Sequence, residues 1–201
     1  MNAPRKAVIL AAGLGTRLRP LTAATPKPLL PLWGTPLLDH TMALLRGWGV
    51  NDVLLNLHHG ADAILRHLRR TVHPGLRVTL SFEPAILGTG GALRRAEWFL
   101  GDAPFWLVNA DVAADLEPAP LLRAAARPRT LAALWLTDRA GPRTVELRRG
   151  RIASFRSPIA GQPGTYTFCG LHLLSPRILR FLPPAGFATI VGAYEAAVRA
   201  G

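Results

Sequence analysis

Short apolar runs alternate with segments of helical periodicity along the first two thirds of the chain. The apolar runs predict buried strands at residues 6–11, 53–57, 76–82, 105–109 and 131–137. The periodic segments predict helices from Thr35-Pro36 to Gly49, over residues 61–70, from the glycine-rich loop 83–92 to about Phe99, and over residues 116–126. In the first of these helices, Thr35 is the expected N-cap and Pro36 the first helical residue. This alternation predicts an α/β fold in which helices flank a mainly parallel sheet.

The pattern changes after residue 140. Residues 144–148 and 151–155 predict a small β appendage, a pair of strands joined by the turn Arg149-Gly150. Residues 166–174 predict a further strand that Cys169-Gly170 interrupts, and helices are expected after the N-cap Ser175 and over residues 192–199. We therefore expect one domain over residues 1–201, with a core at 6–140 and a smaller part at 141–201.

Glycine-rich and polar segments follow several of the predicted strands. Residues 12–34 form a loop long enough to suggest a function, and residues 83–92 form a second glycine-rich loop. The helix that follows the second loop is expected to offer free backbone amides at its N-terminus. Asn109 and Asp111 stand at the end of the strand 105–109. Because ligands bind beyond the carboxyl ends of parallel strands, we expect these three features to meet at one edge of the sheet.

This combination of residues suits a nucleoside triphosphate. Backbone amides of residues 12–17 can wrap its phosphates, while Arg17 and Lys27 neutralise the β and γ groups. Asp111 can hold Mg²⁺, which usually keeps water molecules and substrate phosphates as its other ligands. The alternative interpretation is an ordinary turn after a core strand, with Asp111 as a turn or N-cap residue.

Composition narrows the class of protein. The net charge is +12, but the arginines are scattered and lack interleaved aromatic residues, which disfavours a nucleic-acid binder. No apolar run reaches the length of a membrane span, and the N-terminus is too short and polar for a secretory signal. The single cysteine, Cys169, fits a reducing compartment, so the cytoplasm is expected. His58 and His59 are neighbours, but further ligands at a usual spacing are missing nearby, which disfavours a metal there.

Six segments together resemble the signature of the sugar-1-phosphate nucleotidyltransferases. In chain order they read LAAGLGTRLRP at 10–20 with PKP at 26–28, EP at 83–84, LGTGGA at 87–92, VNAD at 108–111 and FCGLH at 168–172. The resemblance implies a Rossmann-like nucleotidyltransferase core, with residues 6–140 as the nucleotide-binding core and residues 141–201 as the sugar-phosphate-binding part. It also implies a Mg²⁺-dependent reaction of a nucleoside triphosphate with a sugar 1-phosphate, giving a nucleotide-sugar and pyrophosphate. The details are most similar to N-acetylmuramate 1-phosphate uridylyltransferases, followed by mannose-1-phosphate guanylyltransferases.

The resemblance also implies roles for individual residues. The implied nucleotide-binding residues are Leu10, Ala11, Ala12, Gly13, Gly15, Thr16, Arg17, Lys27 and Gly88. The implied sugar-phosphate-binding residues are Glu83, Asn109, Arg156 and Gly170. Arg17, Lys27 and Asp111 are the implied catalytic residues, and Asp111 is the implied metal ligand. Arg156 stands where many members have a lysine, and the alternative for it is a solvated surface arginine.

One departure from the family pattern concerns the metal. Members usually carry a second metal-binding aspartate in a Trp-x-Asp-x-Gly-Thr segment, and this sequence has no such segment. We therefore expect weaker Mg²⁺ binding and slower turnover, and a nucleotide- or sugar-phosphate-binding module with weakened catalysis is the alternative to an enzyme. An NAD-binding domain fits worse, because the first loop lacks Gly-x-Gly-x-x-Gly spacing. The nucleobase, the sugar and a homo-oligomer stay open.

Overall fold

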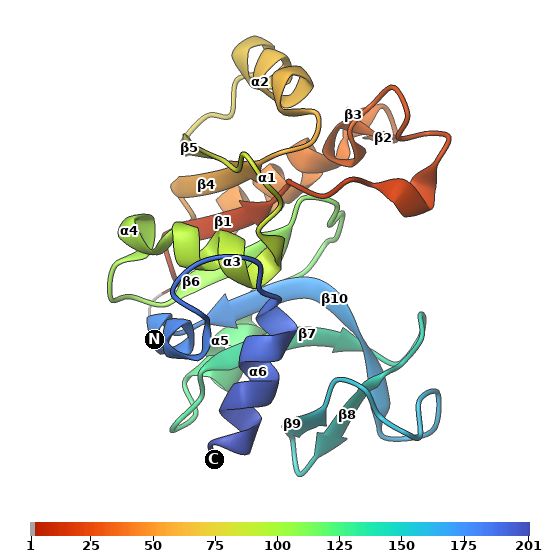
Figure 1. Cartoon of the computed structure of the whole chain (residues 1–201), viewed down its shortest axis with the longest axis vertical. Coiled ribbons are helices and arrows are strands. Elements are labelled where there is room, and N and C mark those ends of the chain that lie inside the picture. Colours follow the sequence, from red (N-terminus) through yellow and green to blue (C-terminus); the bar gives the residue numbers. More distant parts are fainter. Residues whose placement is uncertain (1–2) are drawn as a thin grey trace.

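A computed structural model describes residues 3–201 as a mixed sheet between two layers of helices (Figure 1). The strands are β1 (Lys6–Leu10), β2 (Pro31–Leu32), β3 (Thr35–Pro36), β4 (Asp52–Leu57), β5 (Arg77–Phe82), β6 (Phe105–Asn109), β7 (Ala132–Thr137), β8 (Val145–Arg148), β9 (Arg151–Ser154) and β10 (Thr165–Leu174). The α-helices are α1 (Leu37–Gly47), α2 (Ala61–Arg70), α3 (Gly88–Arg95), α4 (Glu97–Leu100), α5 (Ala119–Ala125) and α6 (Ile190–Arg199). Short 3-10 helices cover Thr16–Leu18, Lys27–Leu29 and Pro176–Phe181.

The main sheet has the order β5-β4-β1-β6-β10-β8-β9, and β7 also pairs with β10. Strands β5, β4, β1 and β6 are mutually parallel, whereas β10 runs antiparallel to β6. The carboxyl ends of the four parallel strands therefore lie at one edge. In Figure 1 the long loop after β1 extends beyond that edge, beside the separate β2–β3 ladder.

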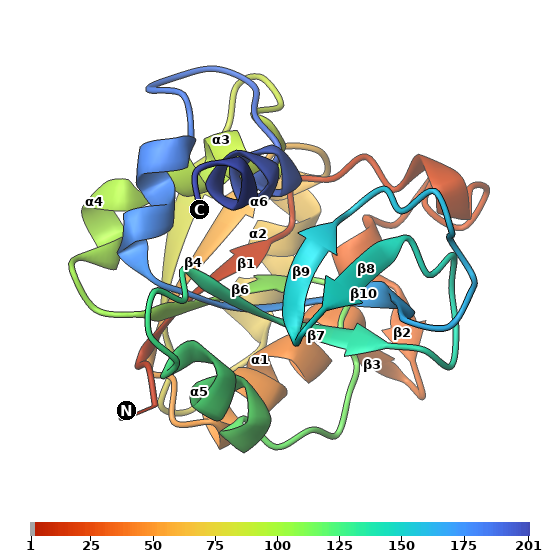
Figure 2. The ribbon, with the colours of Figure 1, turned by 90° about the horizontal axis from the view of Figure 1, so that it is seen from below.

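Each face of the sheet packs against its own set of helices, as Figure 2 shows. Alternate residues of β1 explain this division, because successive side chains of a strand point to opposite faces. Ala7 and Ile9 belong to the core that α1, α2 and α5 cover, whereas Val8 belongs to the core under α3 and α6. The second core also contains Leu174 and Tyr194, so the part after residue 140 shares its apolar interior with the part before it.

The predicted α/β fold with a mainly parallel sheet is confirmed. The predicted strand over 166–174 is one strand, β10, with an irregular register between Phe168 and His172 around Cys169-Gly170. The predicted β pair corresponds to β8 and β9, which continue the sheet beyond β10. Among residues 3–201, no helix combines the length and apolar character that a membrane span requires.

The prediction that Thr35-Pro36 opens a helix is wrong. Both residues belong to β3, where Thr35 pairs with Leu32, and α1 begins at Leu37 with Pro36 at the N-cap position. Trp33 and Gly34 both have positive φ, which closes the two-residue hairpin between β2 and β3. The strand pairing of Thr35 with Leu32 therefore outweighs the preference of Thr35 for a helix N-cap.

Two other helices also differ from the prediction. The helix predicted at 116–126 begins at Ala119, after the N-cap Pro118. The helix predicted to run from the loop 83–92 to about Phe99 is divided at Ala96 into α3 and α4. The last helix begins two residues before the predicted Gly192, because the Thr189 hydroxyl accepts a hydrogen bond from the Gly192 amide and caps it.

Candidate functional site

A cavity of about 300 Å³ lies at the carboxyl edge of the parallel strands. Most of the residues named from the sequence line it. These are Leu10, Ala11, Ala12, Gly13, Gly15, Arg17, Lys27, Glu83, Gly88, Asn109 and Asp111. The three separate sequence features, the first loop, the second loop and the end of the fourth predicted strand, therefore meet at one site.

A buried hydrogen-bond network forms the floor of this cavity. The Asn56 carboxamide oxygen accepts a hydrogen bond from the Ala11 amide at 2.7 Å, and its nitrogen donates to Glu83 Oε1 at 2.8 Å. Glu83 Oε2 accepts from the Leu87 amide at 3.1 Å. Glu83 is 1% exposed and Asn56 is 4% exposed. The network therefore fixes the ends of β1, β4 and β5 and the start of α3 against one another.

The loop after β1 folds back on itself through Thr22. The buried Thr22 hydroxyl donates to the Gly15 carbonyl at 2.9 Å, and the 3-10 helix Thr16–Leu18 follows directly. Arg17 lies in this short helix and its side chain borders the cavity. A Cβ placed on Gly13 would meet no heavy atom within 4 Å, so space for a ligand adjoins this backbone. The loop thus presents peptide groups and one guanidinium to the cavity.

Lys27 and Asp111 contact each other across the cavity through an ion pair between Nζ and Oδ2. The position of Lys27 depends on Pro26, which is buried against Gly60 at the start of α2. A Cβ on Gly60 would lie 2.3 Å from Pro26 Cγ, and the residue has a φ of +68°. Only glycine therefore allows the loop carrying Lys27 to pack this closely against α2.

The prediction that the N-terminus of α3 offers free backbone amides is wrong for two of them, which already donate hydrogen bonds within the protein. The Ala188 carbonyl accepts hydrogen bonds from the amides of Gly90 and Gly91 at 2.8 and 3.2 Å. Thr89 Oγ1 accepts one from the Ile190 amide at 2.9 Å. A segment far along the chain therefore caps this helix. The α3 glycines permit its close approach, since a Cβ on Gly91 would lie 2.5 Å from the Gly186 carbonyl oxygen.

Thr16, Arg156 and Gly170, all named from the sequence, do not line this cavity. The Arg156 side chain is 87% exposed, and its Nε lies 3.9 Å from Glu195 Oε1. Gly170 lies behind the cavity wall, where a Cβ would approach Asn109 Nδ2 to 2.6 Å. Gly170 therefore sets the position of Asn109 rather than facing the cavity itself.

Sequence reasoning missed part of the cavity wall. The missed residues are Pro28, Asn56, Ile86, Thr89 and Ala110. A signal was available for Asn56, because it is a polar residue at the end of the apolar run that forms β4.

The neighbouring histidines His58 and His59 differ in their surroundings. His59 is exposed, whereas His58 donates a hydrogen bond from Nδ1 to the Glu83 backbone carbonyl at 2.7 Å. That contact gives His58 a structural partner beside the floor network.

Comparison with known proteins places this site in a family context. Residues 6–144 match the family model described as "Nucleotidyl transferase". The chain is 31% identical over 205 residues to the N-acetylmuramate alpha-1-phosphate uridylyltransferase of Caulobacter vibrioides, covering 94% of this chain and 83% of that protein. It is 39% identical over 113 residues to a mannose-1-phosphate guanyltransferase of Aspergillus fumigatus, covering 55% of this chain and 31% of that protein.

Solved structures support the fold. A putative glucose-1-phosphate thymidylyltransferase from Bacillus anthracis superposes with a TM-score of 0.81 at 21% sequence identity, covering 98% of this chain and 83% of that one. The inositol-1-phosphate CTP transferase of T. maritima superposes with a TM-score of 0.79, also at 21% identity, covering 99% and 83%. With most of its length matched by the family model, this chain belongs to the nucleotidyl transferase family.

Proposed function

We propose that this chain transfers a nucleotidyl group from a nucleoside triphosphate to a sugar 1-phosphate, releasing pyrophosphate. The observation that carries the proposal is the convergence of the Gly13–Arg17 backbone, Lys27 and Asp111 on one cavity. A phosphate oxygen of the sugar 1-phosphate attacks the α-phosphorus of the nucleotide, and the bond to the β-phosphate breaks. The chain then needs no nucleophile of its own, and catalysis consists of positioning and charge stabilisation.

The charged residues divide this task between them. Arg17 and Lys27 stabilise the negative charge that accumulates on the departing pyrophosphate, while backbone amides of the loop orient it. In the structure Lys27 is paired with Asp111. Binding of the nucleotide with its cation offers each of these two groups a new partner of opposite charge, a phosphate for Lys27 and a cation for Asp111.

The site suits Mg²⁺ in its donor chemistry. Asp111 presents a carboxylate whose side chain is 28% exposed, and the cavity beside it has room for water and phosphate oxygens. We propose that Asp111 holds the ion, which supplies positive charge next to the phosphates when bound. The chain's other groups, Arg17 and Lys27, neutralise the remaining charge. We also propose a cytoplasmic location, which the single cysteine supports.

For the substrate pair we propose UTP and N-acetylmuramate 1-phosphate or a similar sugar. The supporting observation is the Caulobacter uridylyltransferase, which matches this chain over 94% of its length. GTP with mannose 1-phosphate is the second candidate, because the Aspergillus guanyltransferase has the higher identity of 39% over a shorter region. Glu83 and Asn109 line the cavity where the sugar would lie, although both Glu83 oxygens already accept hydrogen bonds from the protein.

A pyrophosphate-release assay tests this proposal. The protein is incubated with Mg²⁺, each nucleoside triphosphate in turn and a panel of sugar 1-phosphates, which includes N-acetylmuramate 1-phosphate and mannose 1-phosphate. We expect release with a uridine or guanosine pair, dependent on both substrates. Absence of release with every pair, together with retained nucleotide binding by calorimetry, would instead favour a binding module with weakened catalysis.

Lys27→Ala is expected to raise KM for the nucleoside triphosphate about 10- to 100-fold, because a cation that contacts the phosphates is lost. The effect on KM for the sugar 1-phosphate should be much smaller. Steady-state kinetics with each substrate varied in turn measures both values. Arg19→Ala is the matched control, since Arg19 is an exposed cation of the same loop that does not line the cavity. Equal effects of the two substitutions would contradict the role of Lys27.

Gly60→Ala is expected to lower kcat/KM about 10- to 100-fold, because the new methyl group would displace Pro26 and with it Lys27. Gly49→Ala is the control. Gly49 also has a positive φ, of +83°, but its added Cβ would meet no heavy atom within 4 Å. Both variants should lose thermal stability through backbone strain, and only Gly60→Ala should lose activity at a temperature where both are folded. Similar activity of the two folded variants would exclude this positioning effect.

A further inference from the structure

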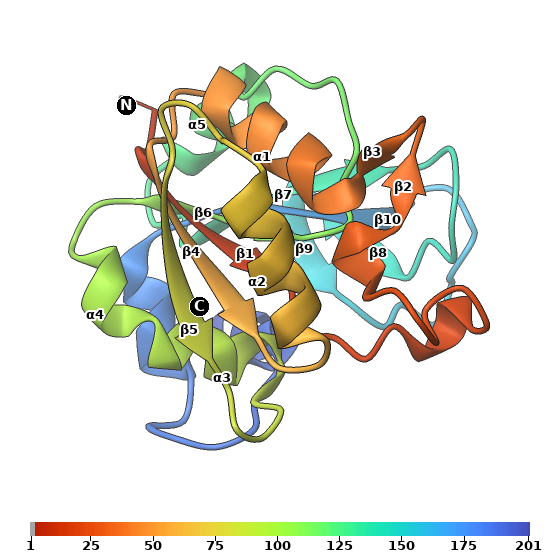
Figure 3. The ribbon, with the colours of Figure 1, turned by 90° about the horizontal axis from the view of Figure 1, so that it is seen from above.

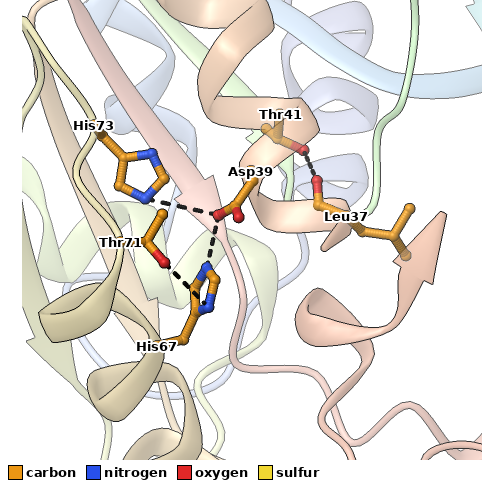
Figure 4. Close-up of polar contacts among 6 residues, drawn as sticks. All are labelled: Leu37, Asp39, Thr41, His67, Thr71 and His73. Atoms are coloured by element: carbon orange, nitrogen blue, oxygen red, sulfur yellow. Dashed lines mark hydrogen bonds and ion pairs between the residues drawn. The ribbon is translucent and has the colours of Figure 1, made fainter. Parts of the chain in front are cut away.

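Three side chains of metal-ligating types meet where α1, α2 and the loop after α2 come together. Asp39 lies in the first turn of α1, His67 lies in α2, and His73 follows α2 in the loop before β5. Figure 4 shows the three side chains pointing toward one another. One potential ligand atom from each residue lies within 4.8 Å of the other two. None of the three lines the nucleotide cavity, so this cluster is separate from the proposed active site.

The distances within the cluster include one hydrogen bond and one longer contact. Asp39 Oδ1 lies 2.8 Å from His67 Nε2 and 3.6 Å from His73 Nε2. The first distance is a good hydrogen bond, but the second is too long for one. Tetrahedral Zn²⁺ with ligands at about 2.0–2.1 Å places neighbouring ligand atoms about 3.3 Å apart, between the two observed values. A small movement of each imidazole ring would therefore bring His67 Nε2 and His73 Nε2 to the distance from Asp39 Oδ1 that two ligands of one metal ion have.

His73 has a nitrogen that the rest of the described chain leaves unsatisfied. Its Nε2 is buried and has no hydrogen-bond partner within residues 3–201. Buried polar atoms are nearly always paired, so this one points to a ligand. His67 already has the arrangement of a metal ligand, because its Nδ1 faces the Thr71 hydroxyl at 3.5 Å while its Nε2 faces the cluster.

We propose that Asp39, His67 and His73 form a binding site for a divalent transition metal of the Zn²⁺ type. Two imidazoles with one carboxylate suit such a metal, whereas Mg²⁺ and Ca²⁺ prefer oxygen ligands. Water can complete the coordination, because the three side chains are between 13% and 19% exposed. Figure 3 shows α1 and α2 side by side on the same face of the sheet. The ion would join these two helices, and its role is to stabilise the fold at a distance from the reaction.

The charges around the cluster disfavour a hard divalent cation at this place. Asp39 is the single acidic member, and its place in the first turn of α1 stabilises the carboxylate. Arg46 of α1 acts on His73, and Arg66 and Arg70 line a surface hollow beside His67. These cations repel a divalent ion. The site therefore needs a metal whose bonds to imidazole nitrogen are strong, and a hard cation that relies on charge alone should not bind.

Calorimetric titration of the tag-free protein with Zn²⁺ tests the proposal. It is carried out with the wild type and with Asp111→Asn, so that the carboxylate of the nucleotide cavity cannot contribute. We expect one Zn²⁺ per chain in both proteins, and a rise in melting temperature of about 5 °C at saturating Zn²⁺. His67→Ala and His73→Ala should each weaken binding at least about tenfold. His59→Ala is the matched control and should bind as the wild type does, because His59 is exposed and outside the cluster.

Cobalt substitution gives a readout that does not depend on the variants' folding. Co²⁺ bound by the wild type should produce the visible absorption bands of a tetrahedral nitrogen and oxygen site, and excess Zn²⁺ should remove them. Mg²⁺ at the same concentration should neither compete nor raise the melting temperature. Absence of Zn²⁺ binding by the wild type would overturn the proposal, as would undiminished binding by His67→Ala and His73→Ala. In either case the cluster is only a hydrogen-bonded contact between α1 and α2.

Discussion

Asp111→Asn is expected to lower kcat/KM for nucleotidyl transfer at least about 1,000-fold, which corresponds to roughly 4 kcal/mol of transition-state stabilisation. The substitution keeps the shape of the side chain but removes its charge. Asp111 is the cavity carboxylate to which we assign the metal, since the carboxylate of Glu83 is engaged with Asn56 and Leu87. The loss should appear mainly in kcat, and raising Mg²⁺ should restore little of it. Pyrophosphate release at several Mg²⁺ concentrations measures the effect.

Asp115→Asn is the control for this substitution. Asp115 is an exposed aspartate of the same loop, four positions further along, and it does not line the cavity. The two variants change the net charge equally, so long-range electrostatics is matched between them. Asp115→Asn should retain activity close to that of the wild type. If Asp111→Asn were equally active, Asp111 would have no part in the reaction.

The second large effect concerns His172, which is buried in the core beneath α6. It lies in β10, is 1% exposed, and its Nδ1 is 2.5 Å from the Tyr194 hydroxyl. The Phe168 ring packs against it edge-on with a centroid distance of 4.4 Å. Because burial removes water from the ring, it lowers the pKa of His172 to about 3. The folded protein therefore holds this histidine neutral over nearly the whole accessible pH range.

This shift makes the free energy of unfolding depend on pH. In the unfolded chain the pKa of a histidine is about 6.5, so the unfolded state binds a proton below that pH while the folded state does not. The contribution of His172 to stability is complete above about pH 6.5 and is lost as the pH falls toward 3. The loss is about 1.4 kcal/mol per pH unit, or about 2 kcal/mol between pH 7 and pH 5.

Urea denaturation at pH 7, 6 and 5 tests this prediction. The double variant His172→Phe with Tyr194→Phe removes the titrating ring and its partner together, so that neither is left unsatisfied. Between pH 7 and pH 5 the free energy of unfolding falls in both proteins, and we expect the fall in the double variant to be smaller than that in the wild type by about 2 kcal/mol. Tyr194→Phe alone keeps the buried imidazole and should keep the wild-type pH dependence. Parallel pH profiles of the wild type and the double variant would contradict the assignment to His172.

The apolar patterning predicted the central architecture because its cause is local. Each parallel strand is a short apolar run closed by a polar or glycine residue, as in Lys6–Leu10 and Phe105–Asn109, and such runs are stable only when covered on both faces. The rule that ligands bind at the carboxyl edge then placed Asp111 near Lys27, and the structure pairs them. Local capping rules were less reliable, as Thr35 in the β2–β3 ladder shows.

The sequence by itself determined the α/β fold, the glycine-rich loop after β1 and most of the residues that meet at the carboxyl edge of the sheet, because strand patterning and motif spacing are properties of neighbouring residues. Only the tertiary structure decided which polar groups remain available to a ligand. Ala188 occupies amides of α3 from about a hundred positions away in the chain, and Asn56 joins Ala11 to Glu83. It also brought Asp39, His67 and His73 together from separate elements. Such contacts arise from packing between distant segments, and no local pattern in the sequence encodes them.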